Sequence, residues 1–192
     1  LFAPLWGRLS DKYGRRPIIM IGLFGTGVSF VLFGFANTLF LLFVSRILGG
    51  ILTAATLPTA QAYVADITSE QERAKRFGLL GAAFGLGFIF GPAIGGLLSV
   101  YGYGVPAFFA AGLAFLNLLS AFLWLPETYT PTNTVRKEYK IIDVKGMWDS
   151  ITHEHIGALI IILSFIALGF SQLQGIYALF AEARFGLAAK DV

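Results

Sequence analysis

The chain has 192 residues, of which 56% are hydrophobic and 13% are charged. Soluble domains carry roughly 25% charged residues, so this composition excludes an ordinary water-soluble protein and favours a chain whose surface faces lipid. The net charge of +3 is too small to indicate a partner, and the absence of cysteine excludes disulfide bonds.

Five apolar runs are each long enough to form a membrane-spanning helix, because crossing about 30 Å of hydrocarbon takes about 20 helical residues. These runs cover residues 17–36, 39–63, 77–100, 107–125 and 155–177. Residues 1–6 read as the end of a further helix, so we expect the sequence to be a fragment of a longer chain. The predicted fold class is all-α, a polytopic membrane helix bundle.

The predicted domain organisation has three parts. Residues 1–128 form part of an N-terminal helical half, residues 129–154 form a central loop, and residues 155–192 begin a C-terminal half with one span and an outer loop. Apolar and charged residues alternate within 141–151, which predicts either a short amphipathic helix on the membrane surface or a partly ordered linker.

Positive charge is distributed unevenly among the polar segments. Segments 7–17, 66–76 and 129–154 contain eleven Lys and Arg residues, whereas the outer segments contain two, Arg184 and Lys190. Because Lys and Arg collect in cytoplasmic loops, we expect these three segments to be cytoplasmic loops of a multi-pass protein in the cell (inner) membrane.

Segment 7–17 is short, charged and flanked by apolar runs, which is typical of a tight loop between two membrane helices. Its candidate functional residues are Gly7, Asp11, Gly14, Arg15 and Arg16.

Asp66 and Arg73 lie where one span ends and the next begins. Both ends face the same side as segment 7–17, so Asp66 could pair with Arg15 or Arg16. Exposed ion pairs contribute at most about 1 kcal/mol each, which suits a contact that must open.

Arg46 lies about seven residues into the run 39–63. An arginine inside the bilayer costs about 2.5 kcal/mol or more, so it should face the protein interior or a wet cavity. Helical spacing places Gly49, Thr53 and Gln61 on the same small, polar face. We favour this functional interpretation; the alternative is an arginine that snorkels toward the outer surface, about 10 Å away.

The run 77–100 contains small residues spaced to share one helical face, and its outer end reads Gly91-Pro92-x-x-Gly95-Gly96. Small residues four apart let helix backbones approach closely, and Pro92 removes one backbone hydrogen bond and bends the helix. Close packing in a bundle and rocking of this helix against a neighbour are both compatible with the pattern.

Isolated polar residues inside the spans could line a substrate path or form helix–helix hydrogen bonds, and the second use is the commoner one. With the two polar residues on the Arg46 face, the candidates are Ser29, Thr53, Gln61, Asn117, Gln172 and Gln174.

No enzyme site is recognisable in the sequence. It contains no G-x-x-x-x-G-K-[ST] phosphate-binding loop, and no nucleophile, metal cluster or cofactor loop presents itself. We therefore predict that the protein is not an enzyme.

Four features stand in order along the chain: segment 7–17, Arg46, the glycine-proline element and Pro126-Glu127-Thr128 at the end of a span. Together they resemble the drug:proton antiporter branch of the major facilitator superfamily. The region 62–78 is also similar to tetracycline-efflux transporters, as is Phe180-x-Glu182-x-Arg184-Phe185. The resemblance covers nearly the whole chain and implies a partial major facilitator fold, from the end of helix 2 to helix 7 of twelve.

The resemblance implies roles for several residues. Asp11 and Arg15 would steady one conformation of an inner gate with Asp66 as their partner, Arg46 would take part in proton transfer, and the glycine-proline element would serve antiport. Ser29 stands where tetracycline exporters of this type commonly carry an acidic residue, a departure that bears on both substrate and proton coupling.

The function implied is proton-coupled efflux of small amphiphilic compounds or drugs by alternating access. The expected partners are a small-molecule substrate, protons and the lipid bilayer, with no cofactor, metal or nucleic acid, and a monomer when full length. Two alternatives stay open: an importer of the same fold, such as a sugar-type symporter, and a non-transporting membrane receptor or scaffold.

Overall fold

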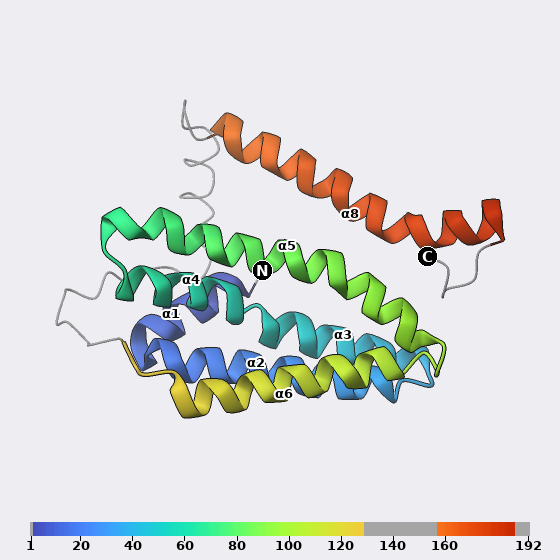
Figure 1. Cartoon of the computed structure of the whole chain (residues 1–192), viewed down its shortest axis with the longest axis horizontal. Coiled ribbons are helices and arrows are strands. Elements are labelled where there is room, and N and C mark those ends of the chain that lie inside the picture. The colour runs from blue at the N-terminus through green and yellow to red at the C-terminus, as the bar shows by residue number, and fades with distance from the viewer. Residues whose placement is uncertain (1, 129–156, 187–192) are drawn as a thin grey trace. The chain divides into compact units, whose positions relative to one another are not determined.

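The computed structural model describes residues 2–128 and 157–186. The described residues form helices and no strands (Figure 1): α1 (Ala3–Tyr13), α2 (Arg15–Gly34), α3 (Leu39–Thr53), α4 (Thr56–Ile67), α5 (Glu70–Ser99), α6 (Val105–Trp124) and α8 (Gly157–Phe185). The chain divides into two compact units, Leu1–Asn133 and Thr134–Val192, and each is considered by itself.

Within the described residues, the helices long and apolar enough to cross a membrane form four spans, Arg15–Gly34, Leu39–Ile67, Glu70–Ser99 and Val105–Trp124. They correspond to the first four predicted runs, and the expected all-α membrane bundle is confirmed. The fifth predicted run, 155–177, falls on α8, while the central loop 129–154 lies outside the described residues.

The two short charged segments are mostly helical, which corrects the prediction of loops at 7–17 and 66–76. α1 continues to Tyr13, so Gly14 alone separates it from α2. Likewise, Thr68 and Ser69 alone separate α4 from α5. A helix can continue beyond the hydrocarbon into water, so charge marks where the helix leaves the lipid and not where its hydrogen bonding ends.

The predicted run 39–63 is broken into α3 and α4 at Ala54 and Ala55. The cause is Pro58 in the first turn of α4. Proline has no backbone N–H, and in a continuous helix its ring would clash with the carbonyl four residues earlier, at Ala54.

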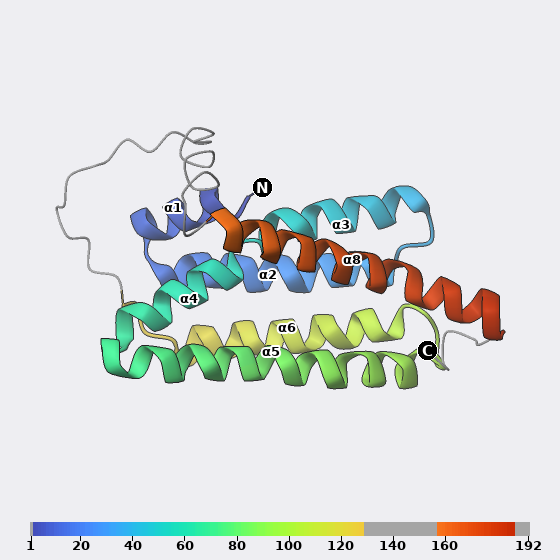
Figure 2. The same ribbon diagram turned by 90° about the horizontal axis from the view of Figure 1, so that it is seen from above.

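α2 lies at the centre of the first unit and packs against α1, α3, α4 and α6 (Figure 2). Glycines on α2 allow its neighbours to approach closely, as is common between membrane helices. A Cβ atom on Gly25 would lie 2.3 Å from the Cβ of Leu52, and one on Gly27 would lie 2.7 Å from the Phe115 ring. By contrast, α5 has no buried residue in the described part of the chain.

The α1–α2 corner, the α4–α5 turn and the end of α6 lie at the same end of the first unit, on the left in Figure 1. We call this the charged end. The opposite end contains the α2–α3 and α5–α6 turns.

Candidate functional site

Gly14 forms the corner between α1 and α2. Its φ of 101° lies in a region that favours glycine, and its N–H donates to the Ser10 carbonyl at 3.1 Å, which ends α1. A Cβ atom at this position would lie 2.5 Å from Oε2 of Glu127. Both the backbone conformation and the available space therefore require glycine.

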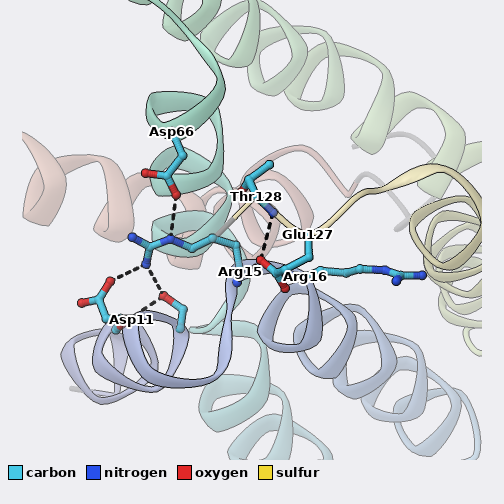
Figure 3. A network of polar contacts seen from close by, with 8 residues as sticks. Asp11, Arg15, Arg16, Asp66, Glu127 and Thr128 are labelled. Carbon is cyan, nitrogen blue, oxygen red and sulfur yellow. Dashed lines mark hydrogen bonds and ion pairs between the residues drawn. The ribbon is translucent and has the colours of Figure 1, made fainter. Parts of the chain in front are cut away.

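The Arg15 side chain binds three acceptors at the charged end (Figure 3). Its Nε donates to Oδ2 of Asp66 at 3.0 Å, and its Nη1 donates to Oδ1 of Asp11 at 2.5 Å and to Oγ of Ser10 at 2.7 Å. The Arg15 side chain is 12% exposed, compared with 34% for Asp66 and 62% for Asp11. This one guanidinium therefore connects α1, α2 and α4.

Ser10 is the buried member of this cluster and is fully shielded from solvent. Its hydroxyl donates its hydrogen to the Gly7 carbonyl at 2.8 Å. The oxygen lone pairs then remain available to accept from Arg15. Neither Ser10 nor this role of Gly7 was predicted from the sequence.

Glu127, which follows the C-terminal end of α6, caps the N-terminus of α2. Its Oε1 accepts from the backbone N–H of Arg15 at 3.0 Å, and its Oε2 accepts from that of Arg16 at 3.1 Å. A helix starts with four unpaired N–H groups; here Gly14 has no side chain to cap them, and Pro17, the third residue of α2, has no N–H. The carboxylate therefore satisfies the first two donors and is favoured by the positive end of the helix dipole.

The sequence analysis treated Glu127 as part of a motif and missed this contact. A signal was available, because Glu127 follows the run 107–125, which must end on the same side of the membrane as the start of α2. Chain topology thus places an acidic residue near a helix start that has no cap of its own.

Arg16 points away from Arg15 (Figure 3). Its Nη2 donates to the Phe122 carbonyl at 2.6 Å, and its guanidinium lies 5.8 Å from the centre of the Phe122 ring. Of the two partners considered for Asp66, Arg15 is the one in contact. Arg73 is exposed in the first turn of α5, and the described contacts do not join it to Asp66.

The arrangement is suited to reversible contact. Exposed ion pairs contribute about 0–1 kcal/mol each, whereas hydrogen bonds to charged groups contribute about 1.5–3 kcal/mol. Asp11 and Asp66 keep access to solvent, so both carboxylates can be hydrated when the pairs separate, whereas the Arg15 side chain, which is 12% exposed, gains solvent only as the helices move apart. Among the described residues, no group of acidic or histidine side chains could hold a metal ion.

Arg46 lies apart from this cluster, on α3. It is exposed in the described unit, and its guanidinium lies 4.3 Å from the centre of the Phe33 ring. Phe33 is next to the last residue of α2, at the end opposite the charged end. The side chain thus packs on an aromatic ring of the neighbouring helix, as cation–π contacts do, and its functional role stays a prediction.

Two of the predicted substrate-path residues make backbone contacts. The Ser29 hydroxyl donates to the Ser45 carbonyl at 2.7 Å, which links α2 to α3. The Thr53 hydroxyl donates to the Gly49 carbonyl of its own helix at 2.8 Å. Ser29 therefore forms the commoner kind of contact, a helix–helix hydrogen bond.

The other predicted path residues lie on α4, α6 and α8. Gln61 and Asn117 are exposed, and Asn117 lines a groove of about 410 Å³ together with Thr56. Gln172 is exposed on α8, and the side chain of Gln174 lies outside the described part of the chain. Within the first unit, Asn117 therefore lines a groove whose described lining does not include Ser29, Thr53 or Gln61.

The glycine-proline element lies within α5, and Pro92 is inside this helix. A Cβ atom on Gly91 or Gly95 would meet no atom within 4 Å in the described structure, and Gly96 is half-buried. This face of α5 is thus open in the described unit, and its role stays a prediction.

Several helices of the first unit are long and apolar enough to cross a lipid bilayer, and the ion pairs of Arg15 join helices at one end of it. These features define an integral, multi-pass helical membrane protein. The model of the family described as the Major Facilitator Superfamily matches residues 1–191. The chain belongs to the major facilitator superfamily.

Relatives and a solved structure agree with this assignment. The chain is 38% identical to "Multidrug resistance protein 1" of Bacillus subtilis (strain 168), covering 100% of this chain and 48% of that protein. It is 36% identical to "Tetracycline resistance protein, class B" of Escherichia coli, covering 97% of this chain and 46% of that protein.

The crystal structure of the human organic anion transporter MFSD10 (TETRAN) matches with a TM-score of 0.63 and 34% identity, over 68% of this chain and 30% of that one. The chain thus spans about half the length of the curated relatives it matches. These relatives belong to a superfamily of transporters and are not enzymes, which confirms the prediction that the chain is not an enzyme.

Proposed function

We propose that the full-length protein is a transporter that exports small amphiphilic compounds or drugs in exchange for protons. The names of its relatives, which include multidrug and tetracycline resistance proteins, support export of drug-like substrates. The observation that carries the proposal is the Arg15 cluster, which joins α1, α2 and α4 through contacts that can open.

In this proposal the charged end is one side of a gate. Arg15, Asp11 and Asp66 hold the closed arrangement, and Glu127 fixes the start of α2 against the end of α6. Arg46 serves proton coupling, and the open glycine face of α5 slides against a neighbouring helix as the two halves of the transporter rock about a midplane site.

The proposed setting is the cell (inner) membrane, with segments 7–17, 66–76 and 129–154 in the cytoplasm and a monomer as the working unit. The excess of Lys and Arg in these segments supports this orientation.

Transport in inverted membrane vesicles tests the proposal. Vesicles that carry the full-length protein and have an acidic interior should accumulate ethidium or tetracycline. The ionophore nigericin collapses the pH gradient and should therefore abolish the accumulation. Asp66→Asn should lower the initial rate several-fold because it removes the charge that pairs with Arg15. Glu72→Gln, which changes an exposed carboxylate 3.9 Å from Arg76, is the matched control.

Each alternative predicts a different result. Uptake driven by the opposite gradient would favour an importer, and the absence of any gradient-dependent movement of either compound would favour a receptor or scaffold. Accumulation that persists after the gradient collapses would contradict proton coupling.

A further inference from the structure

An apolar groove of about 560 Å³ lies between α2 and α6. Four residues of each helix line it, and both sets follow the i, i+3, i+4, i+7 spacing of a single helical face. They are Pro17, Met20, Ile21 and Phe24 on α2, and Phe115, Leu118, Leu119 and Phe122 on α6. Phe24 and Phe115 meet edge to face, with ring centres 6.4 Å apart, where the groove ends.

The groove begins at the charged end and runs into the membrane-spanning part of the bundle. From Pro17 to Phe24 it extends about 10 Å along α2, at about 1.5 Å per residue, which is about a third of the ~30 Å hydrocarbon core. Its walls are accessible, since Ile21 is 41% exposed and Leu119 is 53% exposed. An apolar groove of this kind, which starts beside the charged end and has exposed walls, fits an acyl chain.

Arg16 places a positive charge at the end of the groove that lies nearest the charged end. Arg16 immediately precedes Pro17, and its guanidinium lies over the Phe122 ring that lines the groove. In the described part of the chain its acceptor is the Phe122 carbonyl and not a carboxylate. A guanidinium carries five N–H donors and matches phosphate geometry, so it retains the capacity to bind an anionic headgroup.

We propose that this groove binds one acyl chain of an anionic phospholipid, with the lipid phosphate held by Arg16. Basic pockets between membrane helices on the cytoplasmic side are suited to anionic headgroups. The apolar walls select for a hydrocarbon chain, and Arg16 selects for negative charge. The Arg16 side chain extends away from the Arg15 cluster (Figure 3), and no residue of that cluster lines the groove, so the site is separate from the contacts of the proposed gate.

Native mass spectrometry of the full-length protein in detergent tests the site, with palmitoyl-oleoyl phosphatidylglycerol and palmitoyl-oleoyl phosphatidylcholine as probes. We expect about fivefold tighter binding of phosphatidylglycerol, since one interfacial arginine contributes about that factor. Arg16→Gln should bring the two lipids to equal affinity. Leu119→Trp, which fills the groove, should abolish binding of both.

Leu113→Trp is the matched control, because Leu113 is 52% exposed on α6 and does not line the groove. It should bind both lipids as the unmodified protein does. Ile21→Phe, which narrows the groove from α2, provides a second variant if Leu119→Trp fails to fold, and it should weaken binding of both lipids.

Three results would overturn the proposal. One is equal binding of the two lipids by the unmodified protein, as expected for unselective contact with the bilayer. Another is equal loss of binding in the Leu113 and Leu119 variants. The third is no lipid binding at all, as expected if a second copy or another segment of the full-length protein fills the groove. None of these results depends on transport, so they leave the proposed function untouched.

Discussion

At the scale of single residues, the start of α2 depends on one glycine and one carboxylate that fit each other. Gly14 makes the corner with a positive φ, and Glu127 occupies the space that a side chain at Gly14 would need. The same carboxylate binds the first two N–H groups of α2. The missing side chain of Gly14 leaves room for the Glu127 carboxylate, and that carboxylate caps the helix that begins after Gly14. Changing either residue should therefore disturb the corner between α1 and α2.

Glu127→Gln should lower the free energy of unfolding by about 1–2 kcal/mol, because an amide cannot accept at both positions and carries no charge for the helix dipole. Thermal unfolding of the full-length protein in detergent measures the change. Glu72→Gln is the control, since Glu72 is 60% exposed and its pair with Arg76 should contribute little. Equal stability of the two variants would show that the cap contributes nothing.

Gly14→Ala should destabilise the protein more than a surface substitution does. The added Cβ would be strained at φ 101° and would displace the Glu127 carboxylate. Gly7→Ala is the matched control: Gly7 lies within α1, and a Cβ added there would meet no atom within 4 Å, so alanine should leave stability unchanged or raise it slightly. The difference in melting temperature between the two variants is the measurement, and equal values would contradict the role of Gly14.

The sequence predicted part of this corner. A contact between Asp66 and Arg15 or Arg16 could be expected because charge placement puts both segments on one side of the membrane. The choice of Arg15 over Arg16 could not be expected, since it depends on which way each side chain leaves the first turn of α2. The partnership of Glu127 with α2 joins residues 112 positions apart, and local spacing contains no information about such a contact.

At the scale of helices, apolar runs located the spans well and their ends poorly. The run 77–100 corresponds to α5, which in fact begins at Glu70, because a helix does not stop where its hydrophobic residues stop. The glycines of α5 drew attention in the sequence, yet a Cβ atom added at Gly81, Gly85 or Gly91 would meet no atom within 4 Å in the described structure, whereas glycines of α2 such as Gly25 are in close contact. Both helices contain several glycines, and spacing alone cannot tell which face has a neighbour.

Pro58→Ala should straighten the junction between α3 and α4, because it restores an N–H that can bond to the Ala54 carbonyl. Spin labels at Leu39 and Ile67, which are 75% and 56% exposed, report the change as a longer distance. A continuous helix would separate these positions by about 42 Å at 1.5 Å per residue. Pro106→Ala, in the first turn of α6, should leave the distance unchanged, and an unchanged distance in Pro58→Ala would assign the break to another cause.

At the scale of the whole molecule, composition alone identified a membrane protein, and the order of four motifs identified its superfamily. Both conclusions are available from sequence because they depend on totals and order rather than on particular contacts. Which helices of the first unit pack against α2, in contrast, depends on long-range packing that no local pattern encodes.

The orientation in the membrane can be tested directly with a single introduced thiol, because the 192 residues contain no cysteine and any cysteine elsewhere in the full-length protein can first be replaced by serine. Lys12→Cys at the charged end should react with a membrane-impermeant maleimide only in inverted vesicles. Tyr103→Cys at the opposite end, where the native side chain is 83% exposed, should react only in intact cells. The reverse pattern would overturn the assignment of the charged end to the cytoplasm.

The contact between Glu127 and the start of α2 also has a consequence for biogenesis. A ribosome that adds about 5–20 residues per second reaches Glu127 roughly 6–22 s after it has made Arg15, which lies 112 positions earlier. Throughout that interval the first turn of α2 lacks its cap and must be stabilised by water or by the insertion machinery. The charged end is therefore completed only when α6 and Glu127 have been made, because Glu127 then caps the start of α2 at the corner formed by Gly14.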